Sequence, residues 1–362
     1  MLIFYQNILI IENTYLLTFS SRNPEYVNEE KPAVSSLLTD GRYVDNLMDS
    51  VLNIIKAKKL AADTTEVLGR LGLHTKGFSF SGEDPEPQET TDGISIDVNG
   101  MKWTTATDTV EVKIPRLHFG NKRRGRVVGA EFFDIGGDLA KMDSFVPAKL
   151  TRRMIVSKRA SLYDSIGKIE PIKGKLKIDE REAVLCTSGW DDAVSPEIRA
   201  KWVKNFLMVE KLRGMRFTRA RMPSTALDTN MRLITLVDAA EHIIMVVTFC
   251  GFRVQGGGWS NQQLIGRSAL ANGTIPRNEL QGLNGGSNLA WIVRKALPDW
   301  VESSIIACDS EIALHWTVSD SRKLGCWHRN RVLQIRRGTE IPNIYYIGLR
   351  TMLRMWVQGL KK

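Results

Sequence analysis

The chain has 362 residues, 43% hydrophobic and 25% charged, which is the composition of a globular protein long enough for two or three domains. Its four cysteines form no CxxC pair, so a disulfide framework is excluded and a reducing compartment is indicated. No stretch is long enough to span a membrane, which excludes an integral membrane protein.

The positive charge is concentrated after residue 110. Residues 1–110 carry −7 (9 basic, 16 acidic), residues 111–225 carry +11 (25 and 14), and residues 226–362 carry +6 (16 and 10). A single cluster of basic residues could be an ordinary solvent-exposed face. Several such clusters after residue 110 favour the phosphate backbone of a nucleic acid as the partner. Because no basic leader opens the chain, we expect an intracellular protein of undetermined compartment, not a secreted one.

The first segment, residues 1–80, is predicted to hold strand-like pieces around Tyr43-Val44-Asp45 and then a helix over about 49–72. Residues 77–80 alternate like a short strand. Residues 81–93 are acidic, contain two prolines and lack apolar residues, so they are predicted to be a loop or linker.

The second segment, residues 81–225, has mixed character. Residues 102–103 and 110–114 flank a polar run, which predicts a hairpin. We expect one helix after Pro147 and another over about 196–212, where apolar residues recur at helical spacing.

The third segment, residues 226–362, begins with apolar runs at 233–237, 243–249 and about 264–269, which predict a three-strand meander. A helix is expected over 279–296, a buried strand over 305–308 and a helix around 312–316. The order predicts an α/β domain in a chain that is α+β overall.

Three carboxylates occupy distinctive positions in this third segment. Asp238 ends the first predicted strand, Asp309 ends the buried strand, and Glu279 lies in the first turn of the long helix. Acids so placed can converge on one point. A pair of divalent cations about 4 Å apart, which can cut a phosphodiester, needs such a cluster.

Motifs in a fixed order over roughly residues 35–347 resemble the polyprotein of Bel/Pao-type LTR retrotransposons, from the end of the reverse transcriptase palm to RNase H. The matching segments are Tyr43-Val44-Asp45-Asn46, Thr151-Arg152-Arg153 with Tyr163-Asp164-Ser165-Ile166-Gly167, Gly189-Trp190-Asp191-Asp192, Val237-Asp238-Ala239, Thr274-Ile275-Pro276-Arg277-Asn278-Glu279-Leu280, Cys308-Asp309-Ser310 and Arg329-Asn330-Arg331-Val332.

The resemblance implies a palm remnant at 1–80, a connecting region at 81–225 and an RNase H-like domain at 226–362, with a mixed five-stranded sheet and helices. It implies that Asp238, Glu279 and Asp309 hold two Mg²⁺ ions and cut the RNA strand of an RNA–DNA hybrid, with no small-molecule cofactor. Asp45 would be a remnant of the polymerase metal site. Asn46 replaces the second aspartate there, and an amide binds Mg²⁺ less well, so we expect no DNA synthesis.

The C-terminus departs from the family pattern. A fourth acid is expected soon after Tyr345-Tyr346, but no acid follows Glu340. Our hypothesis is a frameshift at about Met352, and it would be wrong if genomic reads lack an in-frame alternative encoding aspartate. We therefore expect nuclease activity to be impaired.

Other readings remain open. A non-catalytic nucleic-acid binder would use the same basic residues, of which the candidates for phosphate contacts are Arg152, Arg153, Lys158, Arg329, Arg331 and Arg336. A zinc site built from Cys308, His315, Cys326 and His328 matches no usual spacing. An aspartic peptidase needs an Asp-Thr/Ser-Gly turn, which the sequence lacks.

Overall fold

The computed structural model describes most of the chain: residues 7–12, 31–43, 46–51, 53–70, 72–75, 77–84, 95–120, 122–123, 126–127, 131–134, 136–339 and 343–348. The chain folds into two compact units. Unit 1 comprises Met1–Glu111 with Arg216–Ala226, and unit 2 comprises Val112–Met215 with Leu227–Lys362. The three-part division at residues 80 and 225 stays a prediction.

Unit 1 contains a small antiparallel sheet with two helices. Its strands are β1 (Asn7–Glu12), β3 (Asn46–Val51) and β2 (Arg42–Tyr43), in the order β1-β3-β2. The helices are α2 (Pro32–Thr39) and α3 (Ile54–Arg70). The prediction of a helix from residue 49 was wrong at its start, because residues 49–51 pair with β1. Long-range pairing outweighs local helical spacing there.

The predicted strand at residues 77–80 does not form; this segment is irregular. Phe78 and Phe80 both pack against the core of α2, β3 and α3, and their ring centroids are 6.5 Å apart. In a strand, these side chains would share one face and Ser79 would point away. Instead Ser79 is itself buried, so the segment is covered from more than one side.

The second sheet of unit 1 has the order β4-β5-β6-β9. Its strands are β4 (Ile96–Val98), β5 (Met101–Thr104), β6 (Thr109–Val112) and β9 (Arg216–Thr218). The predicted hairpin is confirmed as β5 and β6. The buried Arg219 donates to Asp108 Oδ1 and Oδ2 at 2.6 and 2.9 Å, and Trp103 Nε1 donates to the same carboxylate at 3.0 Å.

Unit 2 begins with a short hairpin of β7 (Lys122–Arg123) and β8 (Arg126–Val127), followed by four helices. The helices are α4 (Leu139–Phe145), α5 (Arg152–Ala160), α6 (Glu170–Leu185) and α7 (Pro196–Glu210). The expected helices after Pro147 and over 196–212 are confirmed as α5 and α7. Helix α6 was not predicted, because its many charged residues obscure its apolar stripe.

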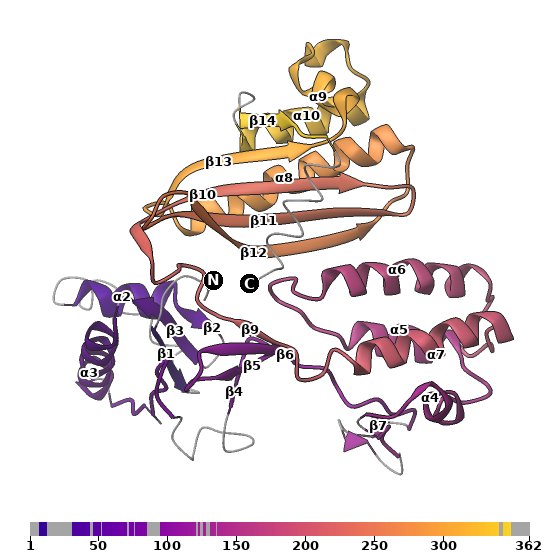
Figure 1. Ribbon diagram of the computed structural model, residues 1–362, viewed down its shortest axis with the longest axis horizontal. Helices are drawn as coiled ribbons and strands as arrows, with labels where there is room; N and C mark the ends of the chain where they lie inside the picture. Colours follow the sequence, from indigo (N-terminus) through magenta and orange to yellow (C-terminus); the bar gives the residue numbers. More distant parts are fainter. Residues whose placement is uncertain are drawn as a thin grey trace. The chain divides into compact units, whose positions relative to one another are not determined.

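The rest of unit 2 is a mixed five-stranded sheet in the order β12-β11-β10-β13-β14, as predicted (Figure 1). Its strands are β10 (Ala226–Ala239), β11 (Ile243–Val254), β12 (Trp259–Leu270), β13 (Val301–Cys308) and β14 (Ile344–Tyr346). The first three are longer than predicted. Gly256, Gly257 and Gly258 all have positive φ and form the turn between β11 and β12.

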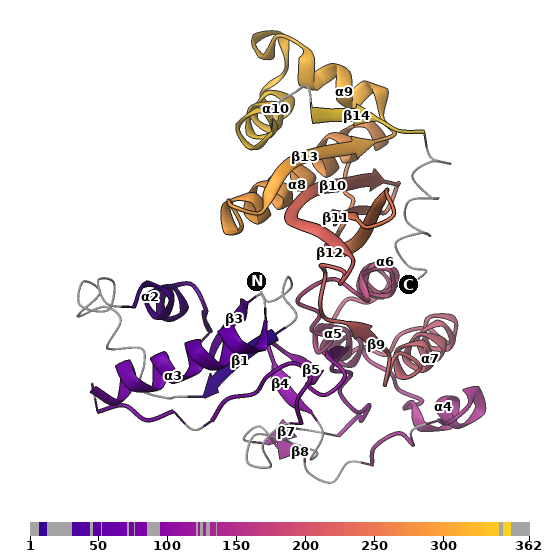
Figure 2. The same ribbon diagram turned by 60° about the vertical axis from the view of Figure 1, so that its left-hand side comes forward.

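Helices complete this domain. The long helix α8 (Ile275–Ala296) crosses one face of the sheet, and α10 (Cys326–Gly338) packs along it, with α9 (Glu311–Val318) beside them (Figures 1 and 2). Their shared core includes Val237, Leu280, Ile306 and Val332, all fully buried.

Helix α6 packs on the edge strand β12, so the helical region and the sheet are parts of one unit. Lys177 Nζ donates to the Ser268 carbonyl oxygen at 2.7 Å, and the Gly266 amide donates to the Ile166 carbonyl oxygen at 2.9 Å. Gly167 has φ +80°, and a Cβ there would lie 2.2 Å from the Gly266 carbonyl oxygen. This glycine is therefore required for the close approach.

Candidate metal centre

Strand register brings two of the predicted acids together. Strands β10 and β13 are parallel, and Val237 pairs with Cys308. Asp238 and Asp309 are the next residues on each strand, so their carboxylates lie side by side at the carboxyl edge of the sheet. Ser310 then caps α9 by accepting from the Ala313 amide.

Small residues bring the third acid to the same place. A Cβ at Gly282 or Gly286 would lie 2.7 or 2.6 Å from the Val237 methyl groups, so only glycine lets α8 lie this close to β10. The buried Asn278 accepts from the Gly273 amide at 3.0 Å and donates to the Gly273 carbonyl oxygen at 3.1 Å. These contacts fix the first turn of α8, from which Glu279 projects.

The three predicted acids form one cluster. Each of Asp238, Glu279 and Asp309 offers an oxygen, and these oxygens all lie within 4.8 Å of one another. Glu279 is buried, while the two aspartates are half-buried. Within the described part of the chain, no second group of His, Cys, Asp or Glu residues has this proximity.

Burial and mutual repulsion make the cluster costly when fully ionised. Burial, followed by the charges of Asp309 and Asp238, raises the pKa of Glu279 to about 8. Burial and the charge of Asp309 also raise the pKa of Asp238. A bound cation would reverse both effects by attracting the carboxylate form.

The oxygens of the cluster fit a hard divalent cation. Among the described residues, Glu279 Oε2 and Asp309 Oδ1 are buried and have no hydrogen-bond partner. Buried carboxylate oxygens without donors are costly, and Mg²⁺ takes oxygen ligands of this type. The residues therefore fit the group that the sequence predicted.

The zinc reading is not supported by the described residues. Cys308 is fully buried in β13, and burial raises the pKa of its thiol to about 12, so it is not a thiolate near neutral pH. His328 packs against Trp316 and Trp327 with ring centroids 4.6 and 5.0 Å apart.

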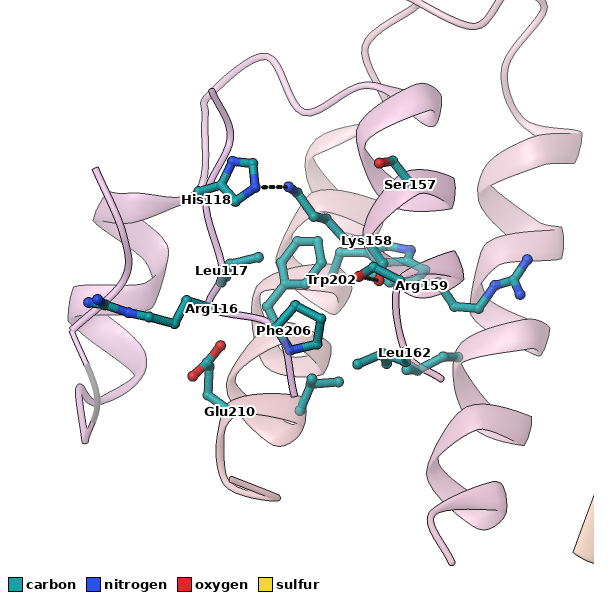
Figure 3. A pocket seen from close by; sticks show the side chains of 14 residues that line it. Arg116, Leu117, His118, Ser157, Lys158, Arg159, Leu162, Trp202, Phe206 and Glu210 are labelled. Atoms are coloured by element: carbon teal, nitrogen blue, oxygen red, sulfur yellow. Dashed lines mark hydrogen bonds between the residues drawn. The ribbon is translucent and has the colours of Figure 1, made fainter. Parts of the chain in front are cut away.

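The α5 residues that were predicted to contact phosphates make contacts within the chain. Arg153 donates to both carboxylate oxygens of Asp191 at 2.8 and 3.0 Å, and the Arg152 guanidinium lies 4.6 Å from the Trp190 ring centroid. Lys158 Nζ lies 3.5 Å from His118 Nε2 at the edge of a small pocket (Figure 3). A nucleic-acid role for Arg152, Arg153 and Lys158 stays a prediction.

The α10 arginines that were predicted to contact phosphates also make contacts within the chain. Arg329 donates to the Ser321 and Leu324 carbonyl oxygens, both at 3.2 Å, and Arg336 donates to the Thr317 carbonyl oxygen at 2.7 Å. Arg331 stacks on Trp327 with 3.7 Å between its guanidinium and the ring centroid. Their predicted nucleic-acid role is likewise untested.

Arg277 is a further candidate for binding that was not predicted from the sequence. It lies exposed in the first turn of α8, two residues before Glu279, with its guanidinium 5.4 Å from the Trp327 ring centroid. Arg277 belongs to the motif Thr274–Leu280, so the sequence could have indicated it. Asp45 and residues 349–362, where the fourth acid was expected, lie outside the described residues.

The sheet order, the crossing helix and the acids at the carboxyl edge define an RNase H-like domain. Residues 151–310 match the family model described as the Pao retrotransposon-like RNaseH-like domain. Over these residues the chain is thus similar to the RNase H-like domain of Pao-type retrotransposons. No curated protein matches the chain.

Solved structures are similar to the chain at low sequence identity. A foamy viral protease-reverse transcriptase in complex with double-stranded DNA is similar with TM-score 0.50 and 10% identity, covering 96% of this chain and 57% of that one. A second such complex gives TM-score 0.49, 8% identity and coverages of 96% and 68%. RNase H1 from the halophilic archaeon Halobacterium salinarum has TM-score 0.21 and 10% identity, and the match covers 34% of this chain and 90% of that one.

The chain therefore spans about 57% of the length of the first of these structures. At 10% identity the likeness to this first structure shows the fold alone. Within the described residues, no helix has the length and apolarity needed to cross a membrane.

Proposed function

We propose that this chain is a fragment of a retrotransposon polyprotein whose RNase H-like domain hydrolyses the RNA strand of RNA–DNA hybrids with divalent metal. The observation that carries the proposal is the cluster of Asp238, Glu279 and Asp309, with ligand oxygens within 4.8 Å of one another. The foamy viral structures, which hold double-stranded DNA, support a nucleic-acid substrate.

The three acids would contribute to metal binding from different elements. Asp238 and Asp309, on adjacent parallel strands, form a rigid pair, and Glu279 closes the site from α8. Bound divalent ions, with Mg²⁺ as our candidate, would supply an activated water and stabilise the leaving 3′ oxygen. To act as a ligand, Glu279 must first lose the proton that its raised pKa retains near neutral pH.

We further propose that activity is impaired. The sequence after Tyr346 contains no acid that could complete a four-carboxylate site. With three carboxylates, one of the two ions would have fewer protein ligands and bind more weakly.

The test is cleavage of a labelled RNA–DNA hybrid with Mg²⁺ by wild-type protein and by Asp238→Asn. Asp299→Asn is the matched control, because Asp299 is exposed and precedes β13 at the opposite end of the sheet. Weak cleavage that Asp238→Asn abolishes and Asp299→Asn keeps supports the proposal. Equal cleavage by all three proteins would contradict it.

A second candidate function is non-catalytic binding. The net charge of +10 and the absence of a C-terminal acid favour it. Salt-dependent binding of the hybrid without cleavage, unchanged in Asp238→Asn, would identify this function.

A further inference from the structure

A second feature of the RNase H-like domain lies away from the acid cluster. The C-terminal ends of α8 and α10 enclose a cleft of about 460 Å³ next to the start of β13. Its lining includes Trp291, Arg294, Lys295, Val301, Arg336 and Arg337. Among the residues that the structure describes, no carboxylate belongs to this lining.

Cations line the cleft, and most of them are available to a ligand. Arg294 and Arg337 are exposed and have no hydrogen-bond or ion-pair partner among the residues that the structure describes. Lys295 is also exposed, with Nζ 5.3 Å from the Trp291 ring centroid. Arg336 differs, because it donates to the carbonyl oxygens of Thr317, in α9, and of Ser319, the residue that follows α9.

Helix dipoles explain only part of this arrangement. A cation in the last turn of a helix is stabilised by the helix macrodipole, and both helices end here. That effect gives no reason for Trp291 to be 46% exposed beside the cations. An exposed indole costs hydrophobic free energy unless something covers it.

We propose that this cleft binds single-stranded nucleic acid, with a base stacked on Trp291 and phosphates held by Arg294, Lys295 and Arg337. Base stacking on an aromatic side chain, next to cations that follow the backbone, is how sequence-tolerant single-strand sites work. A duplex offers its phosphates but not an unstacked base, so the exposed indole favours a single strand.

The cleft is separate from the metal centre. Arg294 is fifteen residues after Glu279 on α8, which places it about 22 Å farther along the helix. The acids lie at the carboxyl ends of β10 and β13, and the cleft lies at the amino end of β13. The cleft can therefore hold a strand that is not the one being cut.

The experiment measures binding of a fluorescein-labelled oligo(dT) and oligo(U) by anisotropy, with EDTA present and in the Asp238→Asn background. Cleavage then has no influence, so failure here is distinguishable from failure of the proposed nuclease. We expect Trp291→Ala to weaken binding about 5- to 100-fold and Trp291→Phe to retain most of it.

The charge test uses Arg294→Gln with Arg337→Gln. The slope of log affinity against log salt should fall by about 1.4, since each single-strand phosphate contact contributes about 0.7. The matched control is Lys149→Gln with Lys204→Gln, which removes the same charge from exposed positions of the same unit and should leave the slope nearly unchanged.

Three results would overturn the proposal. The first is an equal loss in the cleft and control variants. The second is a Trp291→Ala protein that binds like its parent. The third is a site that a poly-glutamate peptide occupies while neither oligonucleotide competes, which would identify an acidic protein partner instead.

Discussion

Metal binding should release a proton from Glu279. Its pKa of about 8, raised by burial and by the neighbouring aspartates, leaves about 90% of the carboxyl protonated at pH 7 and about 10% at pH 9. A cation binds only the carboxylate. Filling the site should therefore release about 0.9 proton at pH 7 and about 0.1 at pH 9 from this residue.

The assay is calorimetric titration of Mn²⁺ into the protein at each pH, in two buffers with different ionisation enthalpies. The difference in heat between the buffers gives the number of protons released. Glu279→Gln should lose this release at pH 7, while Asp299→Asn should match wild type. Intact binding with less than about 0.2 proton released at pH 7 would refute the reasoning about the site's electrostatics.

Other predictions concern stability. In EDTA, the unfolding free energy of wild type should fall by about 3.5 kcal/mol as pH rises from 5 to 8, because the folded state holds a proton on Glu279 that the unfolded state releases near pH 4.5. Urea unfolding of Glu279→Gln should lack this fall. Gly286→Ala should cost about 1–3 kcal/mol, because its Cβ would lie 2.6 Å from a β10 side chain, whereas Gly285→Ala should be neutral or stabilising; thermal melts compare them. Asp108→Asn should destabilise unit 1 by about 3 kcal/mol by leaving the buried Arg219 unbalanced, and an unfolding midpoint equal to wild type would show the pair to be unimportant.

The sequence predicted the structure best where an acidic residue directly follows a recognisable strand or helix pattern. Asp238 and Asp309 each follow an apolar run, and such runs form the parallel pair β10 and β13. Glu279 follows Pro276 in the first turn of α8. These positions allowed the cluster to be predicted, because acids at the ends of neighbouring parallel strands meet at one edge of a sheet.

The sequence was less informative where distant contacts decide the structure. Residues 49–51 have helical spacing but pair with β1, and α6 has too many charges for its buried stripe to stand out. Arg153 and Arg336, whose predicted contacts with nucleic acid stay predictions, also make contacts within the chain that the sequence did not indicate. Their partners are acids and carbonyl oxygens, whose positions depend on the fold.

The central claim is that three acids, distant in the sequence, together hold divalent metal. The most direct measurement is a crystal structure of the protein with Mn²⁺, with data collected at the manganese absorption edge. We predict an anomalous difference peak within ligation distance of Asp238, Glu279 and Asp309. A crystal with full Mn²⁺ exposure that shows no peak there, or shows one only elsewhere on the domain, would contradict the account.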